Sequence, residues 1–366
     1  MHNYKYKIFG YLIFSVTCLF LIKEPFSKEN NKNEFLERKW AGDLQQIDKI
    51  FWNESTVIHL LERAGFGGNQ KLINKMLKLS PTEAVNYMVD YEHQEDIYNE
   101  AFSESGIYDE SLNHFPPSRP ATTKLAKDTG KALGISVKPE GNRALQPIVN
   151  KFFYWLRASR LETKRVAYWW ANKMLNTNRP LEEKMTLFWH NHFSTSETKV
   201  RDYRKLLLQN QTLRKNATSD FKTILISIAQ DPAMLSFLDA GKNVKGAPNE
   251  NFAREIMELF SMGVGNYSEK DIREAARAFT GWNSENLKFI VLKDLHDKDE
   301  KTFLSKTGKF NGLEIIDIIL EQPITARFLV TKLYKEFVRE ELDPLVVEKL
   351  SNEFFLSDYK LKPLLK

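Results

Sequence analysis

The sequence contains very few cysteines, glycines and prolines. Its single cysteine, Cys18, excludes an internal disulfide framework and any zinc site built from several cysteines. Only 16 glycines and 13 prolines occur among 366 residues, well below the roughly 12% that these two types reach in average proteins. Because glycine and proline interrupt helices and shape turns, their scarcity argues against a sandwich or barrel of many short strands. We therefore predict a mainly α protein, a multi-helix globular bundle with at most a few short strands.

An excess of charge of one sign is also missing. The chain carries 53 basic and 48 acidic side chains, interspersed along its length, and its formal net charge is +5. Proteins that bind nucleic acids concentrate basic residues in a patch or stripe, so the sequence predicts no nucleic-acid partner. The P-loop, the dinucleotide-binding glycine pattern, the His-Glu-x-x-His zinc motif and the Gly-x-Ser-x-Gly elbow are absent. No standard motif therefore names an activity.

The long hydrophobic run of the sequence lies near the amino terminus. Residues 8–22 read IFGYLIFSVTCLFLI and follow Lys5 and Lys7, which is the order of a basic start and an apolar core in signal peptides. The run is shorter than the ~20 residues that a membrane-spanning helix needs. We predict that residues 1–27 are a signal peptide or an amino-terminal membrane anchor and that residues 28–50 are a polar tether. The protein is then exported to the periplasm or the cell surface, or anchored to the membrane.

Capping signals predict that residues 51–366 form one helical domain. Ser80-Pro81-Thr82-Glu83 is a capping box with proline at the first helical position, Asp231-Pro232 is a cap followed by proline, and Ser268 has capping-box spacing to Asp271. Helices are expected after Pro180 and over 203–216, 220–230, 232–240, 249–262, 269–280, 312–321, 323–339 and 343–355.

Three stretches of the domain depart from this helical pattern or qualify it. Residues 286–293 alternate as a strand does. Residues 92–147 have an acidic first half and a basic second half with several prolines and glycines, so we expect a surface excursion with little regular structure. The aromatic residues between 147 and 178 have helical spacing and are expected to pack in the core.

His190 and His192 are the first candidate site. Two histidines at i, i+2 point apart on a helix but converge where a helix unwinds or a strand begins. Neutral imidazoles are good ligands for divalent metal ions. The alternative is that each ring packs between aromatic side chains and forms a hydrogen bond with a backbone carbonyl.

The segment 248–260 is the second candidate site. On a helix its polar side chains form one stripe and its apolar side chains cover the opposite face. Glu255 and Glu258 lie one turn apart, so they can share a cation or act as acid and base if their pKa values differ. The alternative is a solvent-facing stripe with pairs such as Glu250–Arg254. The predicted stripe consists of Asn251, Arg254, Glu255 and Glu258, and the predicted apolar face of Phe252, Ala253, Ile256, Met257, Leu259 and Phe260.

The third candidate group, His296, Asp297 and Lys301, follows the predicted strand in a charged loop, where such residues are common on protein surfaces.

Several stretches together resemble the DUF1800 family of mostly exported bacterial proteins. They are HLLERAGFG (59–67), LEEKMTLFWHNHFSTS (181–196), a long block over 231–282 that contains APNENFAREIMELFSMGVG, and HDKDEKTFLSKTGKFNG (296–312). The resemblance implies a mainly helical fold with no established activity. It also implies a neighbouring, sulfatase-related exported protein as a partner. The family domain normally continues beyond the point where this sequence stops, so we expect it to be truncated at the carboxyl terminus.

The resemblance also carries over a set of polar residues, which raises the weight of a cleft lined by the 250–258 stripe. The positions that match the family pattern are His59, Arg63, Glu183, Lys184, His190, His192, Asp231, Asn249, Glu250, Asn251, Arg254, Glu255, Glu258, Asp271, Arg277, Trp282, His296, Asp297 and Lys301.

Two functions are consistent with these residues. The first is a metal-assisted hydrolase that acts on an envelope or extracellular polymer. In it, a divalent metal held by His190, His192 and Glu250 activates water. The catalytic residues would be Arg254, Glu255, Glu258, His296, Asp297 and Lys301. The second is a non-catalytic envelope scaffold or binding module for another exported protein, in which the same residues form buried hydrogen-bonded networks that fix the fold.

Overall fold

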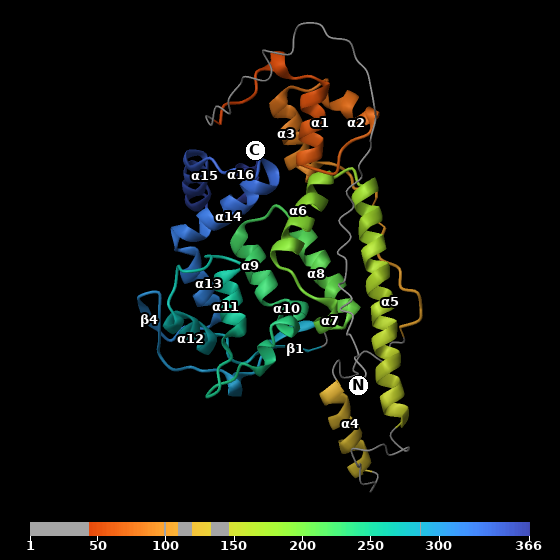
Figure 1. The fold of residues 1–366 in the computed structure, drawn as a ribbon, viewed down its shortest axis with the longest axis vertical. Coiled ribbons are helices and arrows are strands. Elements are labelled where there is room, and N and C mark those ends of the chain that lie inside the picture. Colours follow the sequence, from red (N-terminus) through yellow and green to blue (C-terminus); the bar gives the residue numbers. More distant parts are fainter. Residues whose placement is uncertain (1–43, 99, 109–118, 133–145, 286) are drawn as a thin grey trace, which may run out of the picture. The chain divides into compact units, whose positions relative to one another are not determined.

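Helices form most of the residues that the structure describes, which are 44–98, 100–108, 119–132, 146–285 and 287–366 (Figure 1). The structure is a computed structural model. It confirms the prediction of a mainly α protein. The predicted signal peptide or anchor and most of the predicted tether lie outside the described residues. Within the described part of the chain, no helix is both long enough and apolar enough to cross a membrane.

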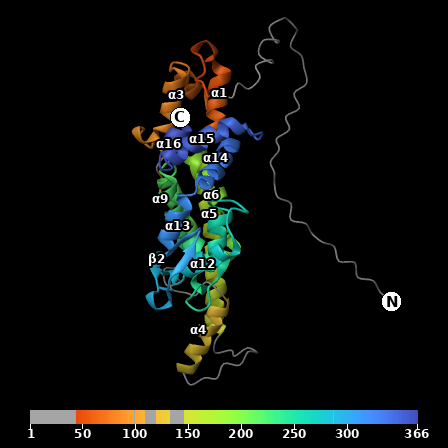
Figure 2. The same cartoon turned by 90° about the vertical axis from the view of Figure 1, so that its left-hand side faces the viewer.

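The helices alternate with short connections along the chain. The first half contains α1 (Glu54–Arg63), α2 (Gln70–Met76), α3 (Pro81–Val89), α4 (Arg119–Ala132), α5 (Gln146–Asn176), α6 (Pro180–His192), α7 (Glu197–Val200) and α8 (Tyr203–Lys215). The second half contains α9 (Phe221–Ala229), α10 (Pro232–Phe237), α11 (Glu250–Glu258), α12 (Glu269–Ala278), α13 (Gly312–Leu320), α14 (Pro323–Phe337), α15 (Pro344–Leu356) and α16 (Leu361–Leu365). The last three lie side by side in both views (Figure 2).

Side-chain caps fix where these helices begin. The Ser80 side chain accepts a hydrogen bond from the Glu83 backbone amide, and the Glu83 carboxylate accepts one from the Ser80 backbone amide. The predicted boxes at Ser80 and Ser268 and the predicted cap at Asp231 are therefore confirmed. Among the described residues, proline is the first residue of five helices, where its missing N–H leaves no hydrogen bond unmade. These helices are α3, α6, α10, α14 and α15.

Two small antiparallel hairpins follow α12. In the first, β1 (Trp282–Glu285) pairs with β2 (Lys288–Val291), so that Trp282 lies opposite Val291. In the second, β3 (Lys301–Phe303) pairs with β4 (Lys306–Gly308). The predicted strand at 286–293 corresponds to β2. Its partner and the second hairpin were not predicted, because strands of three or four residues are too short to show an alternating pattern.

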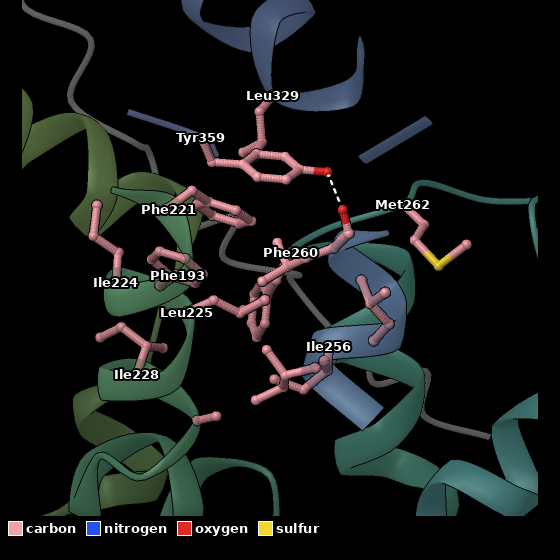
Figure 3. Packing of buried hydrophobic residues seen from close by; sticks show 14 of the residues in the cluster. Phe193, Phe221, Ile224, Leu225, Ile228, Ile256, Phe260, Met262, Leu329 and Tyr359 are labelled. Carbon is pink, nitrogen blue, oxygen red and sulfur yellow. Dashed lines mark hydrogen bonds between the residues drawn. The ribbon is translucent and has the colours of Figure 1, made fainter. Parts of the chain in front are cut away.

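The buried side chains form three clusters. The largest cluster packs α6 against α9 and the helices that follow it. Figure 3 shows its aromatic centre, where Phe193 and Phe221 stack with ring centroids 6.5 Å apart. There the Tyr359 hydroxyl donates a hydrogen bond of 2.7 Å to the Leu320 carbonyl. A second cluster lies under α1, α2 and α3. The third joins the inner face of α5 to Tyr108 and to Tyr203 of α8.

The region expected to have little regular structure is partly helical, because residues 119–132 form α4. Residues 100–108 also pack against α5, where Trp155 Nε1 donates to the buried Tyr108 hydroxyl over 2.8 Å. Residues 100–108 themselves contain no helix or strand, so it is α4 that the sequence did not indicate. Core packing of the aromatic residues is confirmed for Trp155 and Trp170 and is wrong for Tyr168, which is exposed.

Candidate functional site

Helix α11 presents the predicted carboxylate stripe because its other face is held in the core. The Asn249 side chain caps the helix by accepting a hydrogen bond from the Asn251 backbone amide over 3.1 Å. The buried face contains Phe252, Ala253, Ile256 and Met257. The stripe of Asn251, Arg254, Glu255 and Glu258 is exposed or half-buried. The two predicted faces are confirmed except at Leu259, which is exposed.

Arg254 is paired with carboxylates on both sides. Its Nη2 lies 3.2 Å from Oε2 of Glu250, one turn earlier, and 2.7 Å from Oε2 of Glu269 in α12. The hydrogen bond to Glu269 raises the pKa of Arg254 above its ordinary value. The predicted pair Glu250–Arg254 is therefore confirmed. Both groups of that pair are engaged with each other on the surface rather than directed at a bound molecule.

Glu255 and Glu258 have different surroundings although they lie one turn apart. Glu258 Oε2 accepts a hydrogen bond of 2.9 Å from the Tyr267 hydroxyl. Burial and this contact raise the pKa of Tyr267 to about 12. Glu255 has no hydrogen-bond or ion-pair partner among the described residues. Partial burial and the nearby Glu258 charge raise its pKa. Glu255 is thus the predicted acidic residue that remains available for chemistry.

His192 is enclosed, and both of its ring nitrogens are used. Nε2 lies 2.9 Å from the Phe260 carbonyl, so it carries the proton and donates. Nδ1 therefore accepts from the Lys332 amino group, which lies 3.1 Å away and also donates to the Leu259 carbonyl over 3.2 Å. Burial, reinforced by the Lys332 charge, lowers the pKa of His192 to about 3. The alternative expectation of a packed, carbonyl-bonded ring is confirmed for this histidine.

His190 and His192 do not converge, because α6 continues through both. At i, i+2 on a helix their rings point apart. The His190 ring stands edge-on to Trp170, with ring centroids 5.1 Å apart, and burial lowers its pKa. No group of three or more His, Cys, Asp or Glu side chains among the described residues is placed to hold a metal ion. The metal set of His190, His192 and Glu250 stays a prediction. Among the described residues, Glu250 pairs with Arg254 and both ring nitrogens of His192 form hydrogen bonds.

Hydrogen bonds of its own polar residues hold the loop after β2 in place. Asp297 Oδ2 accepts a hydrogen bond of 2.8 Å from Nε of Arg277 in α12. Burial opposes ionisation of Asp297, but the contacts to Arg277 and to the Asp299 backbone amide outweigh it and lower the pKa. Lys301 is 1% exposed, and its amino group donates to the carbonyls of Asp297 (2.7 Å) and Asp299 (2.8 Å). His296 Nδ1 lies 2.9 Å from the Thr280 carbonyl.

These contacts hold the loop against a backbone turn that requires glycine. Gly281 has a φ of +79°, and a Cβ there would lie 2.6 Å from the Leu292 carbonyl oxygen. The Asp297 backbone amide donates to the Thr280 hydroxyl over 2.7 Å, directly beside this turn. The three predicted residues of the loop are thus brought together, with Lys301 Nζ 3.8 Å from Asp297 Oδ1, but as supports of the backbone.

Two buried networks were not predicted as sites. Glu183 in α6 accepts hydrogen bonds from Arg214 Nε over 2.6 Å and from Trp170 Nε1 over 2.8 Å. Asp231 Oδ1 accepts from Gln209 Nε2 over 2.8 Å, and burial raises the pKa of Asp231 to about 7. Glu183 and Asp231 both belong to the family pattern, but their partners come from α5 and α8. Only the tertiary structure shows these pairings.

The predicted site residues therefore fall into three groups: the α11 stripe, His192 with Lys332, and the loop 296–301. Among the described residues, no hydrogen bond or ion pair links side chains of one group with those of another. His192 and Lys332 contact the backbone just after α11, through hydrogen bonds to the carbonyls of Phe260 and Leu259. These bonds connect the second group to the helix that carries the stripe.

In the described part of the chain, the nine predicted catalytic and metal residues do not line any of the following three cavities. An apolar cavity of about 240 Å³ lies between α1, α3, α6 and α14–α16, with Arg63 as the charged residue of its wall. It is smaller than the roughly 300–1,000 Å³ of most small-molecule sites. Open hollows of about 180 Å³ and 570 Å³ lie beside Asp239 and beside Tyr359.

Comparison with known proteins gives one match. A family model described as a protein of unknown function, DUF1800, matches residues 59–366. No curated protein and no solved structure matches the chain.

Proposed function

The chain belongs to the DUF1800 family, and from this premise we propose that it is a non-catalytic exported module that binds another exported protein in the cell envelope. The pairing of the predicted site residues carries the proposal. Arg254, Asp297 and Lys301 each have partners within the fold, and His192 has lost both ring nitrogens to hydrogen bonds. The contacts of His192, Asp297 and Lys301 are buried, and satisfied buried networks of this kind stabilise one arrangement of a fold.

The partner class follows from the family resemblance, which places a sulfatase-related exported protein beside members of this family. Export itself is proposed from the basic and apolar amino terminus, which is built as signal peptides are. With the hydrophobic run retained, the module would stay anchored to the membrane. With the run removed, it would be released to the periplasm or the cell surface.

The proposal is tested by co-expressing the full chain with the adjacent sulfatase-related protein and measuring complex formation by size-exclusion chromatography with light scattering. We expect a stable complex and no hydrolysis of chromogenic carboxylic, phosphoric and sulfuric esters by the module alone. The absence of a complex would overturn the binding role. Turnover that disappears in the double variant Glu255→Gln, Glu258→Gln, with folding intact, would overturn the non-catalytic role.

One observation favours a second candidate, a hydrolase acting on an envelope or extracellular polymer. Glu255 is half-buried, lacks a partner among the described residues and has a raised pKa, whereas Glu258 accepts a hydrogen bond. Such a pair can divide the roles of acid and base. The metal-assisted form of this hypothesis does not fit the donor set, because His192 has no free lone pair and Glu250 is paired with Arg254.

The variant Glu255→Gln distinguishes the two candidate functions when turnover and complex formation are both measured. Glu348→Gln, on the surface of α15, is the matched control. A hydrolase loses turnover in the first variant and keeps it in the second. A binding module keeps its complex with the partner protein in both variants.

A further inference from the structure

Helix α5 is 31 residues long and has two unlike faces. One face packs against α6, α8, Tyr98 and residues 100–108, and it buries Phe152, Trp155, Val166 and Trp170. The opposite face is exposed along the whole length of the helix from residue 151 to residue 176. Neither the carboxylate stripe nor the loop 296–301 involves this face.

Four large apolar side chains form a line along the exposed face. Tyr154, Leu161, Tyr168 and Leu175 follow one another at intervals of seven residues, and they are 49%, 40%, 77% and 79% exposed. On an α-helix this spacing drifts by only ~20° per interval, so the line runs nearly parallel to the axis. It is about 30 Å long and about 10 Å wide.

The charge beside this line has one sign. The exposed charged residues of the face are all basic: Lys151, Arg157, Arg160, Lys164 and Arg165. Glu162, the acidic residue of the helix, is completely buried on the other side. Arg160 pairs with Glu197 at 3.6 Å and Arg165 lies 3.4 Å from Glu162. Arg157 and Lys164 have no ion-pair partner among the described residues. The face is therefore basic although the whole chain is nearly balanced.

The positions next to the line decide which occupant fits. A coiled-coil partner needs apolar residues both on the line and three residues later. Here those later positions are Arg157, Lys164 and Ala171. A second copy of the chain would oppose basic face to basic face. A lipid surface, in contrast, accepts an apolar line with arginine and lysine beside it, because their long stems reach out to the phosphate headgroups. Tyrosine is also enriched at the level of the headgroups. The Tyr168 hydroxyl has no hydrogen bond among the described residues, whereas the Tyr154 hydroxyl donates to the Ile107 carbonyl over 2.6 Å.

We propose that the exposed face of α5 lies on a membrane surface that contains anionic lipids. Tyr154, Leu161, Tyr168 and Leu175 enter the boundary between headgroups and acyl chains, and the basic residues beside them bind lipid phosphates. The inference is independent of the proposed partner protein. It also differs from anchoring by the amino-terminal hydrophobic run, because it assigns a folded face of the domain to the lipid surface.

The experiment places one dye on the face and the same dye elsewhere. In the full chain with Cys18→Ser, Tyr168→Cys or Leu345→Cys is labelled with an environment-sensitive nitrobenzoxadiazole dye. Both positions are 77% exposed, and Leu345 lies on α15. With vesicles of 30% phosphatidylglycerol in phosphatidylcholine, we expect a blue shift and brighter emission at position 168 and no change at position 345. Pure phosphatidylcholine vesicles should give a much weaker response.

A charge variant tests the role of the basic residues in the labelled chain. Arg157→Gln with Lys164→Gln should raise the lipid concentration for half-maximal response roughly thirtyfold. Arg327→Gln with Lys349→Gln, two exposed basic residues on α14 and α15, is the matched control and should leave it unchanged. Circular dichroism verifies that each variant is folded, and the comparison of the two vesicle types stands even where a variant is not.

Three results would overturn the proposal. Vesicle binding without a response at position 168 would assign the membrane contact to the amino-terminal run. Equal responses to the two vesicle types would remove the role of anionic lipid. A response that grows with protein concentration in the absence of lipid would assign the face to a second copy of the chain.

Discussion

The loop 296–301 and the stripe of α11 contain the same kinds of charged residue in opposite surroundings. In the loop, Lys301 is buried and donates to two backbone carbonyls, and Asp297 holds Arg277. In the stripe, Arg254 pairs with Glu250 and Glu269 at the surface, and Glu255 has no partner among the described residues. The contacts in the loop fix the path of the backbone, because Lys301 binds backbone carbonyls. The contacts in the stripe join side chains only, so they can change without moving the backbone. Polar residues of a family pattern therefore serve structure in one place and leave function open in another.

The sharpest way to break this comparison is to remove the loop carboxylate. Asp297→Ala should lower the free energy of unfolding by about 3 kcal/mol, because it removes the ion-pair partner of the buried Lys301 and one of the two carboxylate partners of Arg277, the other being Glu274. Chemical denaturation of the full chain measures this change. Asp294→Ala is the matched control, since Asp294 is an exposed aspartate three residues earlier in the same loop. The control should change stability by less than about 0.5 kcal/mol. Equal small losses in both variants would show that the loop pairing is not structural.

The enclosed His192 predicts a dependence on pH. Its pKa is about 3 in the folded protein and about 6.5 in an unfolded chain. As the pH falls below 6.5, the unfolded state binds a proton that the folded state rejects, so stability is lost progressively toward pH 3. At pH 4.5 the loss due to this residue should be about 2–3 kcal/mol relative to pH 7.

The variant His192→Gln isolates this effect, because other groups titrate in the opposite direction. Burial raises the pKa values of Glu182 and Asp231 to about 7, so their carboxyl groups bind protons first in the folded state and gain stability as the pH falls. The measured quantity is the difference in the free energy of unfolding between wild type and variant, followed from pH 7 to pH 4.5. Parallel curves would contradict the assignment of a neutral, Nε2-protonated ring.

The sequence predicted the helices well because their beginnings depend on local signals. The box at Ser80 and the cap at Asp231 act within four residues, and both helices begin where these caps place them. The polar stripe of α11 followed from helical periodicity alone. The pairing of Lys332 with His192 joins residues 140 positions apart, and no local pattern contains it. The exposed line on α5 was mistaken for core, because aromatic residues at helical spacing show the same periodicity on either face.

The contact between Tyr267 and Glu258 tests whether the stripe also supports the fold. Tyr267→Phe removes the hydroxyl that donates to Glu258 over 2.9 Å. A hydrogen bond to a charged group at a half-exposed position should contribute about 1 kcal/mol to the free energy of unfolding. Tyr168→Phe is the control, because Tyr168 is exposed and its hydroxyl has no hydrogen bond among the described residues. A loss as large as that of Asp297→Ala would make α11 structural in the same sense as the loop.

The smallest expected effect is a gain in stability, caused by replacing Glu255 in the stripe of α11. The nearby Glu258 charge and partial burial raise the pKa of Glu255, so its ionised form is slightly unfavourable in the folded protein at neutral pH. Glu255→Gln should therefore stabilise the protein by about 0.3 kcal/mol, as expected for relief of one like-charge pair at a partly exposed site.

The stabilisation caused by Glu255→Gln should be smaller in 1 M NaCl, because salt screens the repulsion between Glu255 and Glu258. The control variant Glu348→Gln should show no such stabilisation. Thermal unfolding of the three proteins at two salt concentrations resolves these differences. Such a gain would show that the Glu255 carboxylate does not stabilise the fold, which leaves this side chain available for a functional role. If Glu255→Gln destabilises the protein instead, Glu255 has a stabilising contact within the fold, and the case for acid–base chemistry at α11 is lost.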